Sequence, residues 1–204
     1  MRTVVITDPE FLPGETQAVT ALLEAGAWRV HVRKPGADAA EVEALLEKLP
    51  ELYRQRISLH DCHELAARYG VGGVHLNARN PLPPQEFTGM VSRSCHSFGE
   101  LTEYAPVCDY MFLSPIFDSI SKKGYVSRFP LEEIRRRRDD AGSGVDWKRV
   151  LALGGVCPDN IRRVADTGFG GAAVLGYIWE PYKRDADVGA LVARFRNLSD
   201  FSRL

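Results

Sequence analysis

Residues 150–180, VLALGGVCPDNIRRVADTGFGGAAVLGYIWE, contain two short apolar runs on either side of an amphipathic segment. The first run ends at Gly154–Gly155, the second ends at Leu175–Gly176, and Pro158–Asp159 opens the segment between them. So compact a strand–helix–strand pattern predicts a parallel βαβ unit. Glycines directly after both strands leave backbone N–H groups unobstructed, which predicts a phosphate site at Gly155 and Gly176. Glycines that only turn the chain and permit close packing explain the pattern equally well.

The same alternation of strand and helix extends over the rest of the chain. Patterning predicts six earlier strands at residues 3–8, 28–34, 57–61, 72–76, 91–97 and 109–117, with helices at 15–25, 38–53, 63–69, 98–104, 131–140 and 187–197. Eight strands with helices between them predict one (β/α)₈ barrel domain spanning residues 1–204. A doubly wound open sheet is the alternative, but the loop after the first strand, DPEFLPGE, lacks a glycine-rich fingerprint.

Composition limits the classes of partner. The chain has 204 residues, is 45% hydrophobic and 26% charged, and carries a formal net charge of −1, which favours a soluble domain over a general nucleic-acid or membrane surface. It shows neither the pattern of a signal peptide nor a long apolar run, so we expect a cytoplasmic protein, and a homo-oligomer is compatible with the composition. The four cysteines show no CxxC spacing, which predicts reduced structural thiols rather than disulfides or a zinc site.

Polar side chains collect at the C-terminal ends of the predicted strands, which converge on one face of a barrel. They are His31, Arg33, Lys34, His60, Asp61, Asn77, Asn80, Ser94, His96, Ser119, Ser121 and Lys122. Arginine, lysine and serine with glycine N–H groups suit phosphate oxygens, and a carboxylate with nearby amides suits magnesium. His75, inside a strand, is expected to be a packed core histidine. Cys95 and His96 point to opposite faces, so they are not expected to form a nucleophile and its base.

Seven motifs occur in an order that carries a resemblance to a known family. They are VHVRKP at 30–35, LHDCHELA at 59–66, GVHLNARN at 73–80, SRSCHS at 92–97, DYMFLSPIFDSISKKG at 109–124, LALGGVCPDNI at 151–161 and GFGGAAVLGYIW at 168–179. Together they resemble the family of thiamine phosphate synthase and thiazole tautomerase, whose fold is a (β/α)₈ barrel. The synthase joins an aminopyrimidine-methyl pyrophosphate to a thiazole phosphate, and the pyrophosphate leaves before the thiazole nitrogen captures the pyrimidinylmethyl cation.

The resemblance implies a role for each position. Catalytic roles fall on Arg33, Lys122, His31 and Ser94, and Mg²⁺ ligation falls on Asp61 and Asn80. Contacts to phosphorylated small-molecule substrates fall on His60, Ser119, Ser121, Gly155, Gly176, Lys34 and His96.

Several positions depart from the synthase pattern. His60 and Asn80 stand where synthases usually have asparagine and a second aspartate, so the sequence predicts weak or substrate-assisted magnesium binding. The lysine expected at Pro35 is found one place early, at Lys34. HVR and SCHS are closer to the tautomerase pattern, although Pro115 stands where that enzyme has its histidine. A tautomerase and a non-catalytic barrel that binds thiazole phosphate or thiamine phosphate are therefore the alternatives.

Overall fold

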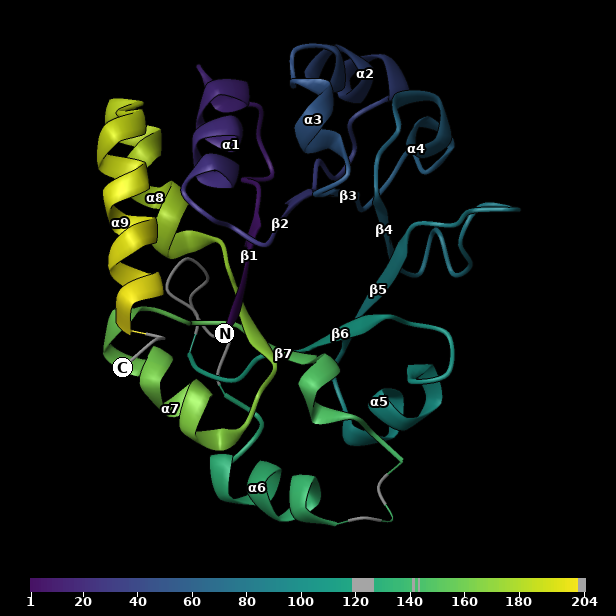
Figure 1. The fold of residues 1–204 in the computed structure, drawn as a ribbon, viewed down its shortest axis with the longest axis vertical. Helices are drawn as coiled ribbons and strands as arrows, with labels where there is room; N and C mark the ends of the chain where they lie inside the picture. The colour runs from purple at the N-terminus through teal and green to yellow at the C-terminus, as the bar shows by residue number, and fades with distance from the viewer. Residues whose placement is uncertain (119–126, 141, 143, 202–204) are drawn as a thin grey trace.

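Eight parallel strands close into a barrel in the computed structural model, which describes residues 1–118, 127–140, 142 and 144–201 (Figure 1). Each strand pairs with the next along the chain, and the last pairs with the first. The strands are β1 (Arg2–Ile6), β2 (Arg29–Val32), β3 (Ile57–Leu59), β4 (Gly73–Leu76), β5 (Met90–Cys95), β6 (Tyr110–Leu113), β7 (Val150–Leu153) and β8 (Gly171–Val174). The single-domain (β/α)₈ prediction is confirmed.

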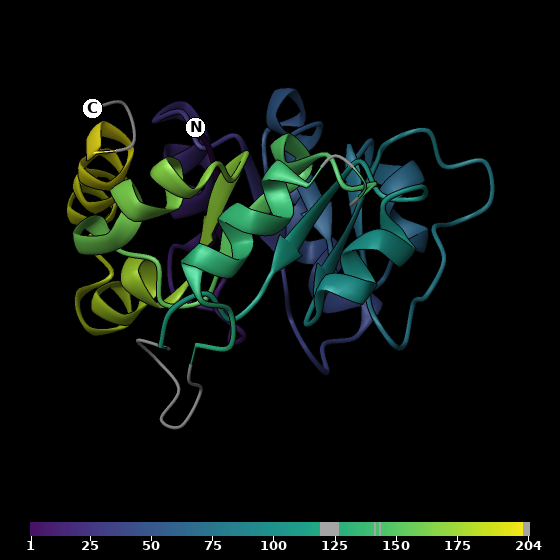
Figure 2. The same ribbon diagram turned by 90° about the horizontal axis from the view of Figure 1, so that it is seen from below.

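Helices surround the strands in both views (Figures 1 and 2). They are α1 (Glu15–Glu24), α2 (Ala39–Glu47), α3 (Glu51–Arg54), α4 (Glu64–Tyr69), α5 (Phe98–Tyr104), α6 (Leu131–Asp139), α7 (Pro158–Thr167), α8 (Gly176–Asp185) and α9 (Val188–Phe201), with a 3₁₀ turn η2 at Trp147–Arg149. Within the described chain, no helix has the length and apolar character needed to cross a membrane.

One connection differs from the sequence prediction, and another contains no helix. The helix expected over 38–53 is interrupted between α2 and α3 at Pro50, whose extended backbone (ψ 135°) and missing N–H end one helix before the next begins. Residues 77–89, between β4 and β5, contain no helix. The chain at this position is instead rich in proline and polar residues, so the barrel mouth beside β4 is bordered by a loop.

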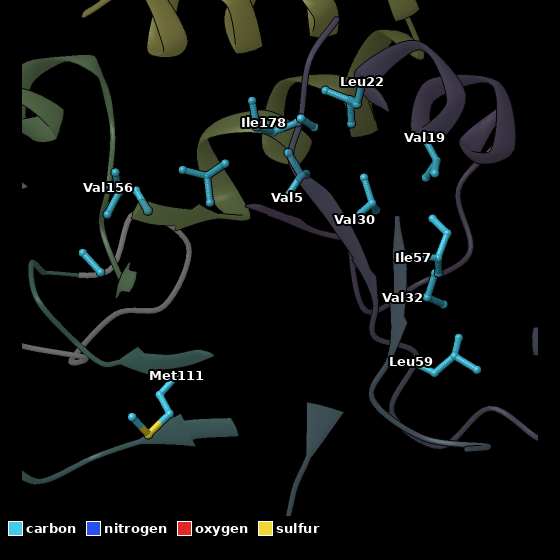
Figure 3. Packing of buried hydrophobic residues seen from close by; sticks show 14 of the residues in the cluster. Val5, Val19, Leu22, Val30, Val32, Ile57, Leu59, Met111, Val156 and Ile178 are labelled. Atoms are coloured by element: carbon cyan, nitrogen blue, oxygen red, sulfur yellow. The ribbon is translucent and has the colours of Figure 1, made fainter. Parts of the chain in front are cut away.

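The main core lies between the strands and the surrounding helices (Figure 3). Val30 and Val32 of β2 belong to it, and Val19 and Leu22 supply the facing side of α1. All four side chains are at most 2% exposed. Because strand side chains alternate, the other residues of β2, Arg29 and His31, point into the barrel.

The barrel interior has one apolar side and one polar side. Val4, Ile6, Tyr110, Phe112, Leu151 and Ala173 form an apolar cluster from β1 and β6–β8. The strands β2–β5, by contrast, contribute or lead into buried polar side chains, namely Arg29, His31, Ser58, His60, His75 and Ser92. Buried polar groups require partners, so this half of the barrel must hold an internal hydrogen-bond network.

Two buried aromatic residues fix α8 against the first strand and its loop. Trp179 Nε1 donates to Ile6 O at 2.8 Å, and the Tyr182 hydroxyl donates to Pro13 O at 2.8 Å. Both side chains are at most 1% exposed. This anchoring holds the N-terminus of α8, at Gly176, beside the C-terminal end of β8.

Candidate functional site

A cavity of about 880 Å³ opens at the C-terminal ends of the strands. Eight residues selected from the sequence line it, namely Arg33, His60, Asp61, Asn77, Ser94, His96, Gly155 and Gly176. They follow or end β2, β3, β4, β5, β7 and β8, so strand convergence brings distant parts of the chain to one site. Ser119, Ser121 and Lys122 lie outside the described residues.

One side of the cavity offers donors to an anion. Gly176 and Tyr177, the first two residues of α8, line it, and first-turn N–H groups of a helix have no acceptor within the helix. Arg33 also lines it, and its guanidinium donates no hydrogen bond to a described residue. These groups suit phosphate oxygens.

A lysine that the sequence reading overlooked borders the same side. Lys183 of α8 lines the cavity, and its Nζ lies 2.8 Å from Oδ2 of the buried Asp8. The hydrogen bond to Asp8 raises the pKa of Lys183. The pair joins α8 to the end of β1. In the sequence, the only sign of Lys183 is its position two helical turns after the Gly176 motif.

Arg93 is a second overlooked cation at the cavity. Its guanidinium carbon lies 4.1 Å from the ring centroid of Tyr104, and its Nε and Nη1 are buried without a hydrogen-bond partner in the described chain. Strand alternation turns Arg93 away from its neighbour Ser94, which accounts for its omission from the predicted set. An unsatisfied guanidinium edge favours an anionic ligand nearby.

The carboxylate of Asp61 is held by nitrogen donors. Arg79 donates to Oδ1 through Nε at 3.0 Å and to Oδ2 through Nη2 at 2.9 Å, and Asn80 Nδ2 lies 3.2 Å from Oδ1. Asn77 Nδ2 approaches Oδ1 at 3.4 Å. A magnesium site needs converging oxygens, whereas here Asn80 presents its amide nitrogen and Arg79 already neutralises the carboxylate. The predicted ligands Asp61 and Asn80 therefore do not fit a magnesium ion in this arrangement.

Lys34 is placed apart from the cavity, contrary to its expected phosphate contact. Its Nζ lies 2.5 and 2.7 Å from the two carboxylate oxygens of Glu15 and donates to Asp8 O at 2.9 Å. Lys34 is 2% exposed and Glu15 is 4% exposed. With its proton donors committed to these buried acceptors, Lys34 joins β2 to α1 and Asp8.

Three histidines, in β2, directly after β3 and in β4, meet at the cavity floor. His31 Nδ1 lies 2.9 Å from His60 Nε2, and the rings of His60 and His75 stack with centroids 4.0 Å apart. His60 and His75 line the cavity, whereas His31 is fully buried beneath them. His75 is thus both the core histidine that the strand pattern predicts and a wall of the site.

Burial keeps these three imidazoles neutral. It lowers the pKa of His31 and His60 well below the ordinary value and lowers the pKa of His75 to about 3. Their ring nitrogens lie within 4.8 Å of one another, a spacing that admits a metal ion. The near-parallel rings of His60 and His75, at 21°, direct their in-plane lone pairs side by side instead of toward one ion. The cluster is better described as a hydrogen-bonded core.

The remaining predicted residues lie at the rim. His96 is exposed, and its Nδ1 lies 3.0 Å from Ser114 O. Gly155 has φ +63°, and a Cβ there would lie 2.1 Å from Asp118 O. The loop after β6 therefore requires glycine at position 155 for packing, whatever ligand the cavity holds.

Comparisons with known proteins agree on one family. Residues 3–178 match the family described as thiamine monophosphate synthase. The thiamine-phosphate synthase of Albidiferax ferrireducens is 28% identical, over 98% of this chain and 92% of that protein. That of Thermus thermophilus is 30% identical, over 72% of each. A crystal structure of thiamine phosphate pyrophosphorylase from Bacteroides thetaiotaomicron superposes with a TM-score of 0.86 at 36% identity, covering 100% of this chain and 98% of that one.

Proposed function

The chain belongs to the thiamine monophosphate synthase family, and on that premise we propose that it makes thiamine phosphate. The reaction joins an aminopyrimidine-methyl pyrophosphate to a thiazole phosphate and releases pyrophosphate. The observation that carries the proposal is the single cavity that combines the α8 N-terminus with Arg33 and Arg93. A synthase must hold two phosphorylated substrates at once, and these groups supply donors on more than one wall.

The proposed bond changes need anion stabilisation above all. The bond between the methylene carbon and the pyrophosphate oxygen breaks, and pyrophosphate leaves with the electron pair. The lone pair of the thiazole nitrogen then forms the new carbon–nitrogen bond, so no proton moves in the coupling itself. Hydrogen-bond donors directed at the departing oxygens stabilise the developing negative charge most strongly where water is excluded.

Arg33 and Arg93 are the residues we assign to the departing oxygens. Both line the cavity, and the loop residue Lys122 is assigned to the same role from the family motif. The N–H groups at Gly176 are assigned to the thiazole phosphate. Because the nitrogen donors around Asp61 do not fit a metal ion, we assign no step to magnesium.

The test supplies purified protein with both substrates and measures thiamine phosphate and pyrophosphate together. We expect both products in equal amounts, and we expect Arg33→Gln to lower turnover by about a hundredfold. Arg68→Gln is the matched control, since Arg68 is 66% exposed and pairs with Glu43 away from the cavity. Absence of product at every magnesium concentration would contradict the proposal.

A thiazole tautomerase is the second candidate, and the buried neutral histidines at the cavity floor favour it. His60 and His96 both line the cavity, where they suit proton transfer to a bound ring. Isomerisation of a thiazole carboxylate phosphate without the pyrimidine substrate, followed by NMR, distinguishes this activity from coupling. Binding of thiamine phosphate without either reaction, measured by calorimetry, would instead favour the non-catalytic barrel. A cytoplasmic location and a homo-oligomer stay predictions.

A further inference from the structure

A continuous chain of buried side chains crosses the barrel interior to the cavity floor. Arg29 Nε donates to Ser58 Oγ at 3.0 Å, and Ser58 Oγ lies 3.3 Å from the Tyr110 hydroxyl. That hydroxyl lies 2.6 Å from His31 Nε2, and His31 Nδ1 lies 2.9 Å from His60 Nε2. Arg29 starts β2 at the opposite end of the barrel from the cavity, which His60 lines.

Each member of the chain is shielded from water. Arg29 is 4% exposed and His60 is 7% exposed, while Ser58, Tyr110 and His31 have no exposed surface. Water therefore cannot supply alternative partners in the middle of the chain, and each proton must be placed by its neighbours. Burial also lowers the pKa of His31 and His60, so each ring carries one proton and accepts at its other nitrogen.

Arg29 determines the direction of this chain because a guanidinium donates and never accepts. Ser58 Oγ accepts from Arg29, and its own buried hydrogen needs an acceptor, which the Tyr110 oxygen at 3.3 Å supplies. Tyr110, having accepted, donates to His31 Nε2. His31 then carries its proton on Nδ1 and donates it to His60 Nε2, which leaves the proton of His60 on Nδ1.

A second branch fixes the proton at Ser94. The Ser92 hydroxyl donates to Val74 O at 3.3 Å, so Ser92 Oγ accepts from His75 Nδ1 at 2.9 Å. His75 Nε2 is then an acceptor, and the Ser94 hydroxyl, 3.0 Å away, donates to it. Ser94 accordingly presents lone pairs to the cavity that it lines.

We propose that Arg29, acting through Ser58, Tyr110 and His31, holds His60 as the Nδ1-protonated tautomer, so that the cavity floor presents a donor at His60 and an acceptor at Ser94. Arg29 and Tyr110 are positioning residues in this arrangement. The floor selects a neutral ligand edge with a hydrogen-bond acceptor facing His60 and a hydrogen-bond donor facing Ser94. A ring nitrogen beside an amino group has this arrangement. A lactam edge, in which a ring N–H lies beside a carbonyl, has the reverse polarity.

The direct test is NMR of the imidazole nitrogens in protein labelled with ¹⁵N-histidine. The chain contains five histidines, so single substitutions suffice to assign the signals. We expect His31 and His60 to be protonated at Nδ1 in the native protein. Ser58→Ala, which removes the serine link between Arg29 and Tyr110, and Tyr110→Phe, which removes the donor to His31, should each give a mixture of tautomers at His60.

Ser94→Ala is the matched control, because it removes the partner of His75 Nε2 and lies outside the chain from Arg29 to His60. It should change the His75 signals while His60 stays protonated at Nδ1. An Nε2-protonated His60 in the native protein, or an unchanged His60 tautomer in both Ser58→Ala and Tyr110→Phe, would overturn the proposal.

A ligand pair tests the consequence, and this part rests on the proposed function. The probes are 4-amino-5-hydroxymethyl-pyrimidine phosphate and its 4-oxo counterpart, compared by calorimetry. We expect the amino compound to bind about tenfold or more tightly, a difference near 1.4 kcal/mol. Tyr110→Phe should narrow that ratio while leaving the affinity for inorganic pyrophosphate unchanged, and an unaltered ratio would contradict the ligand selection.

The two proposals fail separately. A protein with Nδ1-protonated His60 that forms no thiamine phosphate overturns the synthase function and retains the tautomer assignment. A protein that forms thiamine phosphate with His60 protonated at Nε2 retains the synthase function and overturns the tautomer assignment.

Discussion

The guanidinium of Arg79 spans the carboxylate of Asp61, with Nη2 2.8 Å from Oδ1 and 2.9 Å from Oδ2. Asp61 is the second residue after β3, at the position where the resemblance to the family implies a magnesium ligand. Arg79 belongs to the loop after β4, which in this barrel contains no helix. The pair therefore places a positive charge from the protein where the motif predicts a metal ion.

This relationship predicts that Arg79 competes with divalent cations. Arg79→Ala should tighten Mn²⁺ or Mg²⁺ binding several-fold, because it frees both oxygens of Asp61, and Asn80→Asp combined with it should tighten binding further. Titration calorimetry measures the effect. Arg68→Ala serves as the control, since Arg68 is equally exposed, at 66%, and pairs with Glu43 instead. Equal metal affinity in Arg79→Ala and the native protein would show that Arg79 does not compete for Asp61.

A second prediction concerns the buried ion pair of Lys34 and Glu15. Removing one member leaves an unpaired buried charge, so Lys34→Met should lower the free energy of unfolding by about 3–5 kcal/mol. Lys34→Met combined with Glu15→Leu should recover much of that loss, because no charge is then left buried. Urea denaturation measures both. A single variant as stable as the native protein would show that Lys34 contributes little to folding.

The neutral histidines predict how stability depends on pH. Folding lowers the pKa of His31, His60 and His75 below the value of an unfolded histidine, near 6.5, so the unfolded state binds more protons once the pH falls below that value. Their contribution is complete above pH 6.5 and is lost as the pH falls, for His75 toward about 3. Between the folded and unfolded pKa values, each such histidine should lower the free energy of unfolding by about 1.4 kcal/mol for every pH unit of acidification.

Urea denaturation at pH values from 7.5 to 5 measures the slope. His75→Asn should reduce the slope by about one histidine's share. A slope of zero between pH 6.5 and 5 would show that the buried histidines are charged in the folded protein.

The fold was predictable because its signals are local and repeated. Each strand is a short apolar run closed by polar residues or glycine, and eight such runs identify a barrel without knowledge of any contact. The residues at strand ends were predictable for the same reason, since strand convergence alone places Arg33 and Asp61 at one mouth. The break at Pro50 was missed because the helical pattern continues on both sides of the proline.

The partners of the site residues were not predictable, because they come from distant positions. Lys34 looks like a cavity residue from its place after β2, yet the acid that binds it lies on α1. Arg79 was overlooked as part of a polar turn, although it binds the carboxylate that the metal prediction relied on. The protons on His60 depend on Arg29 and Tyr110, which no spacing in the sequence connects to it.

The last prediction separates two glycines that the sequence treats alike. At Gly155 a Cβ would lie 2.1 Å from Asp118 O, and the backbone is left-handed at φ +63°. The conformation alone costs a residue with a side chain about 1–2 kcal/mol, and the clash adds to it, so Gly155→Ala should lower the melting temperature clearly.

Gly176 is the first residue of α8, where alanine suits the helix, so Gly176→Ala should leave the melting temperature close to that of the native protein. Its added Cβ borders the N–H groups that we assign to the thiazole phosphate, and we expect several-fold weaker binding of that ligand. Thermal denaturation measures the melting temperatures of the two variants, and calorimetry measures their affinities for the thiazole phosphate. Native affinity in Gly176→Ala would place the phosphate away from the α8 N-terminus, because a ligand held there would meet the new methyl group.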